Sequence, residues 1–112
     1  MSATKVTEAN FESVVLGAVH PVLLDVYADW CNPCRHMAPL IEELADELEG
    51  RAVIGKIDSD ANQSLTAKLR IGGLPTFIVF DQGKEVDRKV GIQSREKLLA
   101  ALGQQTKRET EQ

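Results

Sequence analysis

Two cysteines separated by two residues, Cys31 and Cys34, constrain this chain more than any other feature of its sequence. They are the only cysteines present, so they can pair only with each other or with another molecule. A disulfide that closes so small a ring removes little entropy from the unfolded chain and makes a poor structural staple. At this spacing, redox chemistry and metal binding are the two functions to weigh.

The cysteine pair lies between an apolar run and a helical pattern. Residues 22–28, Val-Leu-Leu-Asp-Val-Tyr-Ala, are typical of a central strand that is covered on both faces. From Pro33 onward, a helix is indicated by an apolar stripe of Met37, Leu40, Ile41, Leu44, Ala45 and Leu48. Pro39 inside this pattern predicts a kink rather than a break, and Gly50 is expected at the C′ position.

The N-terminal part predicts a short edge strand and a helix. The strand is expected to end at Lys5–Val6, and Thr7 is a candidate N-cap for the helix that follows. The apolar positions of this helix have the spacing of one helical face: Phe11, Val14, Val15 and Ala18. Gly17 and the His20–Pro21 pair are expected to stop it.

The second half predicts three more strands and two helices. Strands are expected over 52–57, 76–80 and 85–90, with a hairpin turn at 81–84. Asp60 is expected to cap the helix that carries Leu65, Ala67 and Leu69, with Gln63 completing a box-like arrangement. Ser94 is expected to cap the last helix, whose apolar face is Leu98, Leu99 and Leu102 and which ends at Gly103.

This order of elements predicts an α/β fold with a central mixed sheet of four to five strands, flanked by about four helices. Residues 1–112 are expected to form a single domain, with a frayed polar tail at 104–112. The cysteines fall just beyond the carboxyl end of a central strand, where open α/β sheets place their sites.

The net charge and the N-terminal sequence indicate which partners and which cellular compartment to expect. The formal net charge of −4 argues against general affinity for nucleic acid or an anionic membrane. No secretory signal is visible at the N-terminus and no apolar run has the length of a transmembrane helix, so we expect a cytoplasmic protein. In the cytosol a lone Cys-x-x-Cys at a strand-to-helix junction favours catalysis over a structural role.

The position of the cysteines also predicts their reactivity. Unpaired N–H groups and the helix dipole favour a thiolate at Cys31, at or just before the first turn of the helix. A thiolate that is populated and still nucleophilic near neutral pH is what exchange with a disulfide requires. Cys34, one turn into the helix, is expected to be more buried and placed to attack a mixed disulfide.

The segment Trp30-Cys-Asn-Pro-Cys34 resembles the Trp-Cys-Gly-Pro-Cys motif of the thioredoxin family. The flanking segments 24–29 and 35–40, the loop 71–76 and the Val90–Gly91 pair agree with that family in register, so the similarity spans about residues 5 to 103. The resemblance implies a thioredoxin fold and the reduction of protein disulfides without a bound cofactor. It also implies a thioredoxin reductase as the electron donor, and we expect a monomer.

The resemblance assigns roles to individual residues. Cys31 would be the attacking cysteine and Cys34 the resolving one, forming together the redox-active disulfide. Pro75 would be a cis proline that faces the pair. An apolar docking surface would surround the sulfurs: Trp30, Asn32, Pro33, Gly73, Leu74, Gly91 and Ile92. The backbone of Leu74 would pair with an extended substrate segment.

Asp25 is the polar residue that interrupts the apolar run 22–28. If it is buried, loss of hydration should raise its pKa. In thioredoxins the matching residue lies beneath the cysteines and is thought to accept the proton of the resolving thiol. Lys56 matches a lysine near that carboxylate. The alternatives are an aspartate that reaches water from the end of the strand and an exposed lysine.

The sequence departs from the family pattern at three positions near the motif. Asn32 stands where thioredoxins usually have glycine, Tyr27 where many have tryptophan, and Gly72 where many have a basic residue. These changes leave the chemistry in place but leave the choice of reductase and of targets open.

Two other functions compete with disulfide reduction. A structural zinc site needs four ligands, and this chain has one Cys-x-x-Cys with His20 and His36 outside zinc-finger spacing, so we expect no metal. His36 is expected at a solvent-facing position of the helix. The second alternative is a binding or scaffolding module that uses the same apolar patch without turnover. The presence of Asp25 and Pro75 alongside both cysteines favours the enzyme.

Overall fold

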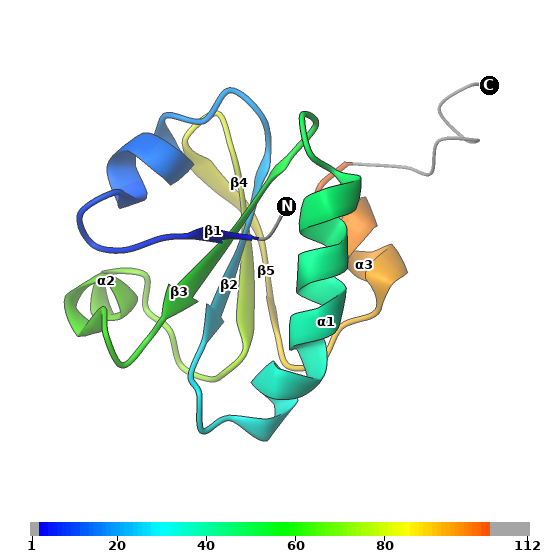
Figure 1. The fold of residues 1–112 in the computed structure, drawn as a ribbon. Helices are drawn as coiled ribbons and strands as arrows, with labels where there is room; N and C mark the ends of the chain where they lie inside the picture. Colours follow the sequence, from blue (N-terminus) through cyan, green and yellow to red (C-terminus); the bar gives the residue numbers. More distant parts are fainter. Residues whose placement is uncertain (1–2, 104–112) are drawn as a thin grey trace.

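The computed structural model describes residues 3–103 as a five-stranded mixed sheet with helical segments on both faces (Figure 1). The strands are β1 (Thr4–Lys5), β2 (Val22–Tyr27), β3 (Val53–Asp58), β4 (Thr76–Asp81) and β5 (Lys84–Val90). The helical segments are η1 (Glu12–Leu16), α1 (Asn32–Glu47), α2 (Gln63–Lys68) and α3 (Arg95–Ala101). The predicted α/β class is therefore confirmed. No helix in this described part of the chain is long and apolar enough to cross a membrane.

The sheet has the strand order β1-β3-β2-β4-β5. β1 and β2 pair with β3 in parallel, while β4 runs antiparallel to both β2 and β5. β2 is thus the central strand, and all but the last of its residues are buried. Its carboxyl end leads directly to the cysteines, as the apolar run 22–28 predicted.

Alternation along the strands divides the core into two layers. Leu23, Phe77 and Val79 point to the face covered by α1 and α3, whereas Val22, Leu24 and Val26 point to the face covered by η1 and α2. Because side chains alternate along a strand, Asp25 shares the α1 face with Leu23. Asp25 therefore lies on the same side of the sheet as the helix that carries Cys34.

Helix α1 begins directly after Cys31, which is its N-cap residue with extended backbone angles (φ −89°, ψ 113°). The expected stripe is buried at Met37, Ile41 and Leu44, and the helix continues through Pro39 without interruption. It ends with Leu48 as C-cap, and Gly50 follows in the left-handed region at φ +84°. The long, well-packed helix anchors the cysteine pair to the core.

Thr7 caps the first turn as expected, and its carbonyl accepts the Phe11 N–H at 3.0 Å, but the helix that follows is not a regular α-helix. The residues after Thr7 form a turn in which Asn10 Oδ1 accepts from the Thr7 N–H at 2.7 Å and the Thr7 hydroxyl accepts from Ala9 N at 3.2 Å. The helical segment that follows is the π-helix η1, and its N-cap, Phe11, makes no side-chain cap. Thr7 and Asn10 therefore form a reciprocal cap around the first turn, ahead of the π-helical residues 12–16.

The expected cap at Asp60 and the box with Gln63 are wrong. The N-cap of α2 is Asn62, which makes no side-chain cap hydrogen bond, and the Gln63 amide donates to the Asp60 carbonyl. The free N–H of Leu65 in the first turn is satisfied by Glu8 Oε2 at 3.2 Å. A carboxylate from a distant segment thus replaces the local cap, which the sequence pattern could not indicate.

The cap at Ser94 and the hairpin turn agree with the predictions, whereas Gly50 lies one residue beyond the expected C′ position because Leu48 is the C-cap of α1. Ser94 Oγ accepts from the Lys97 N–H at 3.2 Å at the start of α3. Gln82 and Gly83 both have positive φ between β4 and β5, as a tight hairpin requires. The predicted frayed tail at 104–112 lies outside the described residues.

Candidate active site

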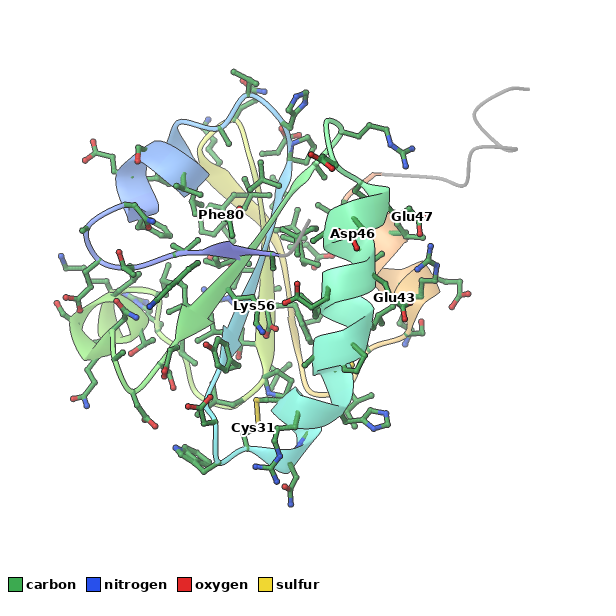
Figure 2. The ribbon with its side chains drawn as sticks, viewed as in Figure 1. Cys31, Glu43, Asp46, Glu47, Lys56 and Phe80 are labelled. Atoms are coloured by element: carbon green, nitrogen blue, oxygen red, sulfur yellow. A yellow bond between two sulfur atoms is a disulfide. The ribbon has the colours of Figure 1, made fainter. Side chains whose placement is uncertain are left out.

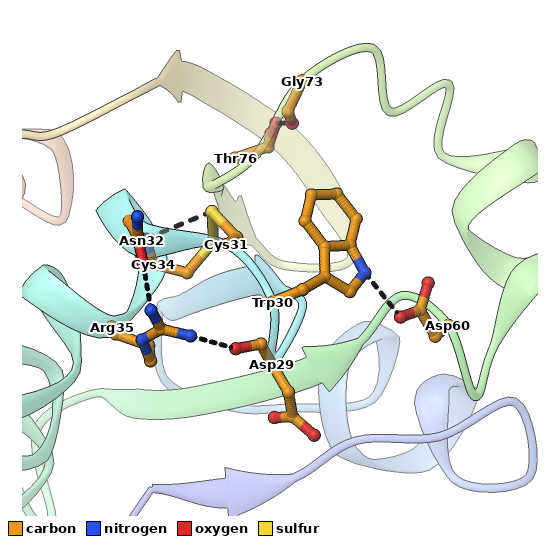
Figure 3. Close-up of a disulfide and its surroundings, with 9 residues drawn as sticks. All are labelled: Asp29, Trp30, Cys31, Asn32, Cys34, Arg35, Asp60, Gly73 and Thr76. Atoms are coloured by element: carbon orange, nitrogen blue, oxygen red, sulfur yellow. Dashed lines mark hydrogen bonds between the residues drawn. A yellow bond between two sulfur atoms is a disulfide. The ribbon is translucent and has the colours of Figure 1, made fainter.

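Cys31 and Cys34 form a disulfide at the N-terminal end of α1, with 5.2 Å between their Cα atoms (Figure 3). Cys31 Sγ accepts a hydrogen bond from the backbone N–H of Cys34 at 3.2 Å. The two side chains are nearly buried, at 5% and 4% exposure. The helix therefore directs a backbone donor at Cys31 Sγ, the environment that favours a thiolate after reduction.

An open groove of about 660 Å³ lies beside the disulfide. One wall comes from the cysteine segment, with Trp30, Cys31, Asn32 and Pro33. The other residues come from the loop after β3, from α2 and from the loop before β4: Ser59, Asp60, Gln63, Thr66, Ile71, Gly72, Gly73 and Leu74. The groove is large enough for an extended peptide segment to approach Cys31.

Five of the predicted docking residues line this groove, namely Trp30, Asn32, Pro33, Gly73 and Leu74. Trp30 is 66% exposed, which is unusual for so large an apolar side chain. Leu74 packs against the cysteine cluster. The structure therefore brings these residues together around the disulfide.

Pro75, Gly91 and Ile92 do not line the groove itself. The Leu74–Pro75 peptide bond is cis, and the Gly91 N–H donates to the Pro75 carbonyl at 2.8 Å. Gly91 has φ +93°, so a side chain here would be strained, and Ile92 is exposed. Gly91 is thereby held against the loop that forms one wall of the groove.

Asp25 is buried, with 2% of its surface exposed, and the strand-end alternative is excluded. Its Oδ1 has no hydrogen-bond partner among the described residues. Burial raises the pKa of Asp25 to about 7, the nearby Lys56 cation opposes this increase, and the Glu42 carboxylate adds to it. Asp25 can therefore exchange a proton near neutral pH.

A cavity of about 270 Å³ connects Asp25 with Cys34. It is lined by Asp25, Tyr27, Ala28, Asp29, Cys34, Arg35, Ala38 and Lys56. A space of this volume, bordered by the charged groups of Asp25, Asp29 and Lys56, can hold several water molecules. Asp25 and Cys34 thus share one cavity although they come from different elements.

Lys56 borders the same cavity and is only partly exposed. Its ammonium lies 4.8 Å from the centroid of the Tyr27 ring and 3.6 Å from Glu42 Oε2, between the sheet and α1 (Figure 2). The alternative of a simple exposed lysine is therefore wrong. The burial of its stem and the two partners fix the cation near Asp25.

Several groove and cavity residues were not predicted as site residues. Asp60, which was expected to cap a helix, accepts a hydrogen bond from Trp30 Nε1 at 2.8 Å. Arg35 donates to the Asp29 carbonyl at 2.8 Å and to Asn32 Oδ1. Gln63 was expected only in a helix cap, and Thr66, which lies in the same helix, was given no role. The one signal in the sequence that could have identified Arg35 is its charged side chain directly after the second cysteine.

Among residues 3–103, no three His, Cys, Asp or Glu side chains lie close enough together to share a metal ion. His36 is exposed on α1, as expected. The chemistry available to the site is that of the two sulfurs and the buried carboxylate.

A cysteine pair that closes to a disulfide at a helix N-terminus, next to an open groove, is suited to thiol–disulfide exchange. On this fold it places the protein among the thiol–disulfide oxidoreductases, as the sequence predicted.

The comparisons with known proteins give the family. The thioredoxin family model matches residues 2–104. The thioredoxins of Staphylococcus aureus strains Mu50, MW2 and N315 are each 46% identical over 102 residues, covering 91% of this chain and 96% of the relative. The chain belongs to the thioredoxin family, and it is a protein-disulfide reductase that acts on disulfide-containing proteins.

Proposed function

We propose that Cys31 is the nucleophile of this reductase. Its thiolate attacks one sulfur of a target disulfide, forms a mixed disulfide with that sulfur and releases the other as a thiolate that takes a proton from solvent. The support is the position of Cys31 as N-cap of α1, where its Sγ already accepts the Cys34 N–H at 3.2 Å. Its side of the disulfide also borders the open groove.

Cys34 is the resolving cysteine and Asp25 its proton acceptor. The Cys34 thiol gives its proton to the Asp25 carboxylate, and the resulting thiolate attacks Cys31 Sγ. The Cys31–Cys34 disulfide forms, the mixed disulfide breaks, and the second target sulfur leaves reduced. The observation that carries this assignment is the shared cavity, because Asp25 and Cys34 both line it and the pKa of Asp25 is raised to about 7. Lys56 supports the carboxylate electrostatically.

The docking surface for the target is formed by Trp30, Asn32, Pro33, Gly73, Leu74, Pro75, Gly91 and Ile92. Exposed Trp30 and Ile92 offer apolar area, and the loop before β4 offers backbone groups to an extended target segment. The backbone of Leu74 is the proposed pairing partner of that segment.

The oxidised pair needs two electrons and two protons to return to the dithiol, and we assign their delivery to a thioredoxin reductase. The protein works as a monomeric single domain in the cytoplasm, without a bound cofactor. Its net charge of −4 disfavours nucleic acid and anionic membranes as partners.

The test is insulin reduction by the Asp25→Asn variant at several pH values, with dithiothreitol as reductant. Loss of the proton acceptor should slow turnover about tenfold or more near pH 7. The defect should shrink toward pH 9, where hydroxide can accept the proton in place of the Asp25 carboxylate. Asp81→Asn, at an exposed site, is the matched control. A wild-type rate and pH profile in Asp25→Asn would remove Asp25 from the mechanism.

A further inference from the structure

The guanidinium of Arg35 joins two parts of the cysteine segment that the backbone leaves separate. Its Nη1 donates to the Asp29 carbonyl at 2.8 Å, and its Nη2 donates to Asn32 Oδ1 (Figure 3). Arg35 is in the first turn of α1, whereas Asp29 belongs to the loop before the helix. One side chain therefore fastens the loop to the helix that follows it.

The two acceptors lie on either side of Cys31 in the sequence. The backbone N–H of Arg35 donates to the Cys31 carbonyl at 3.1 Å, so Arg35 also holds the backbone of Cys31. The Cys34 N–H donates to Cys31 Sγ at 3.2 Å within this frame. Movement of the loop away from α1 would lengthen the bond from the Cys34 N–H to the sulfur.

The chemistry of the arginine side chain suits this arrangement. A guanidinium presents several N–H donors in a rigid, planar fork and can hold two acceptors at once. A lysine ammonium carries the same charge but imposes no such geometry. The Asn32 amide oxygen is occupied by Arg35 in this arrangement, which leaves its NH2 group as the donor available at the rim of the groove.

Arg35 also brings a positive charge to the sulfur pair. It lines the cavity shared by Asp25, Cys34 and Lys56, while Asn32 lines the groove on the other side. A cation next to a cysteine favours the thiolate. Arg35 therefore adds a positive charge beside Cys34 to the hydrogen bonds by which it holds the Cys31 segment.

We propose that Arg35 and Asn32 are positioning residues that work as a pair, here called the Arg35 clamp, and that the clamp holds Cys31 in the geometry from which its thiolate attacks. The clamp consists of the Arg35 guanidinium, the Asn32 side chain and the Asp29 carbonyl. It gives a role to Asn32, the residue that stands where the family usually has glycine. This proposal rests on the assignment of Cys31 as the nucleophile.

The experiment measures the alkylation rate of Cys31 by iodoacetamide in the reduced protein as a function of pH. The variants are Arg35→Ala, Asn32→Ala, the double variant and Arg35→Lys. Arg51→Ala is the matched control, because Arg51 is also exposed, bonds a backbone carbonyl near the other end of α1 and carries the same charge. Denaturant titrations of each variant establish that it is folded.

The clamp predicts a slower reaction near neutral pH and a titration curve displaced to higher pH. Arg35→Ala and Asn32→Ala should each react about threefold more slowly, the size expected for losing part of a charged hydrogen-bond pair at an exposed site. The double variant should be no slower than Arg35→Ala, because both changes break the same interaction. Arg35→Lys should recover only part of the rate, and Arg51→Ala should react like the wild type.

Other outcomes would overturn the proposal. Full recovery in Arg35→Lys would show that charge alone matters. A double variant that is slower by the product of the single effects, about ninefold, would show that Arg35 and Asn32 act independently. Wild-type behaviour of Arg35→Ala, or an equal loss in Arg51→Ala, would also exclude the clamp. Alkylation of the wild type at Cys34 rather than Cys31 would instead contradict the proposed function itself.

Discussion

Asp25 and Lys56 are register partners on the parallel strands β2 and β3, and both side chains line the cavity that reaches Cys34. Because register partners point to the same face, the sheet itself places the cation beside the carboxylate. Burial favours the neutral acid, and Lys56 favours the carboxylate. The balance leaves a group that titrates near neutral pH.

The buried carboxylate should lower the stability of the native state at neutral pH. The pKa of Asp25 is about 7 in the folded protein against an ordinary value of 3.8, so the cost appears above pH 3.8 and is complete above pH 7. The difference corresponds to roughly 4 kcal/mol at most. Asp25→Asn should therefore raise the free energy of unfolding of the oxidised protein at pH 8 by up to that amount.

Urea titrations at pH 8 and near pH 3 measure this effect. Near pH 3 the acid is protonated in both states, and the advantage of Asp25→Asn should vanish. Asp81→Asn should change little at either pH because Asp81 is exposed. If Asp25→Asn were only as stable as the wild type at pH 8, or less stable, the ionised Asp25 carboxylate would not be destabilising the folded protein.

Glu42 should tune Asp25 through its charge and through Lys56. Glu42 Oε2 lies 3.6 Å from Lys56 Nζ, and this carboxylate raises the pKa of Asp25. Glu42→Gln should therefore lower the pKa of Asp25, whereas Lys56→Met should raise it. The carboxyl carbon of Asp25, followed by NMR through a pH titration, reports both changes.

The neighbouring exposed residue Glu43 provides the control, since Glu43→Gln removes the same charge from the outer side of α1 (Figure 2). Glu42→Gln keeps an oxygen that can accept the Ala3 N–H, a bond of 2.8 Å in the native protein. A shift of the same sign in Glu42→Gln and Lys56→Met would contradict the electrostatic account.

The hydrogen bond from Trp30 to Asp60 should matter for protein substrates. Trp30 Nε1 donates to Asp60 Oδ2 at 2.8 Å, and both residues line the groove. Asp60→Ala removes this acceptor, so the Trp30 side chain is no longer held in one orientation on the docking surface. We expect kcat/KM for insulin to fall about threefold, the cost of one exposed hydrogen bond, chiefly through KM. The rate with a small aromatic disulfide should not change, because this substrate does not need the groove. An equal loss of rate with both substrates would mean that Asp60 acts on the sulfurs rather than on the docking surface.

Glu8 should stabilise the fold as the cap of α2. Its Oε2 accepts the Leu65 N–H at 3.2 Å, and the carboxylate lies at the positive end of the helix dipole. Glu8→Ala should cost about 1 kcal/mol in urea titrations at neutral pH. Glu12→Ala, also an exposed residue of the N-terminal segment, should cost less, and a similar loss in both variants would argue against a capping role.

The sequence predicted what depends on local pattern. The apolar run 22–28 indicated β2, its one interruption indicated Asp25, and the stripe after Pro33 indicated α1. These signals are strong because a central strand is buried on both faces along its length and a helix buries one face in every turn. The resemblance added the docking residues, five of which meet in the groove.

What the sequence did not predict depends on contacts between distant segments. Glu8 caps a helix that begins 55 residues later, and Asp60 bonds Trp30 from another loop. Glu8 and Asp60 could equally well be ordinary surface or capping residues. Their identity in the sequence therefore does not indicate which groups they bond. The clamp made by Arg35 was not predicted either. One of its acceptors is the backbone carbonyl of Asp29, and the identity of a residue gives no information about the partner of its carbonyl.

The most direct test of the account is to trap the reaction between its two steps. The Cys34→Ser variant, reduced and mixed with a disulfide-containing protein, cannot resolve the mixed disulfide. We expect mass spectrometry to find a covalent adduct through Cys31 and almost no turnover, whereas Cys31→Ser should form no such adduct. Wild-type turnover by Cys34→Ser, or an adduct that does not involve Cys31, would contradict dithiol–disulfide exchange at this site.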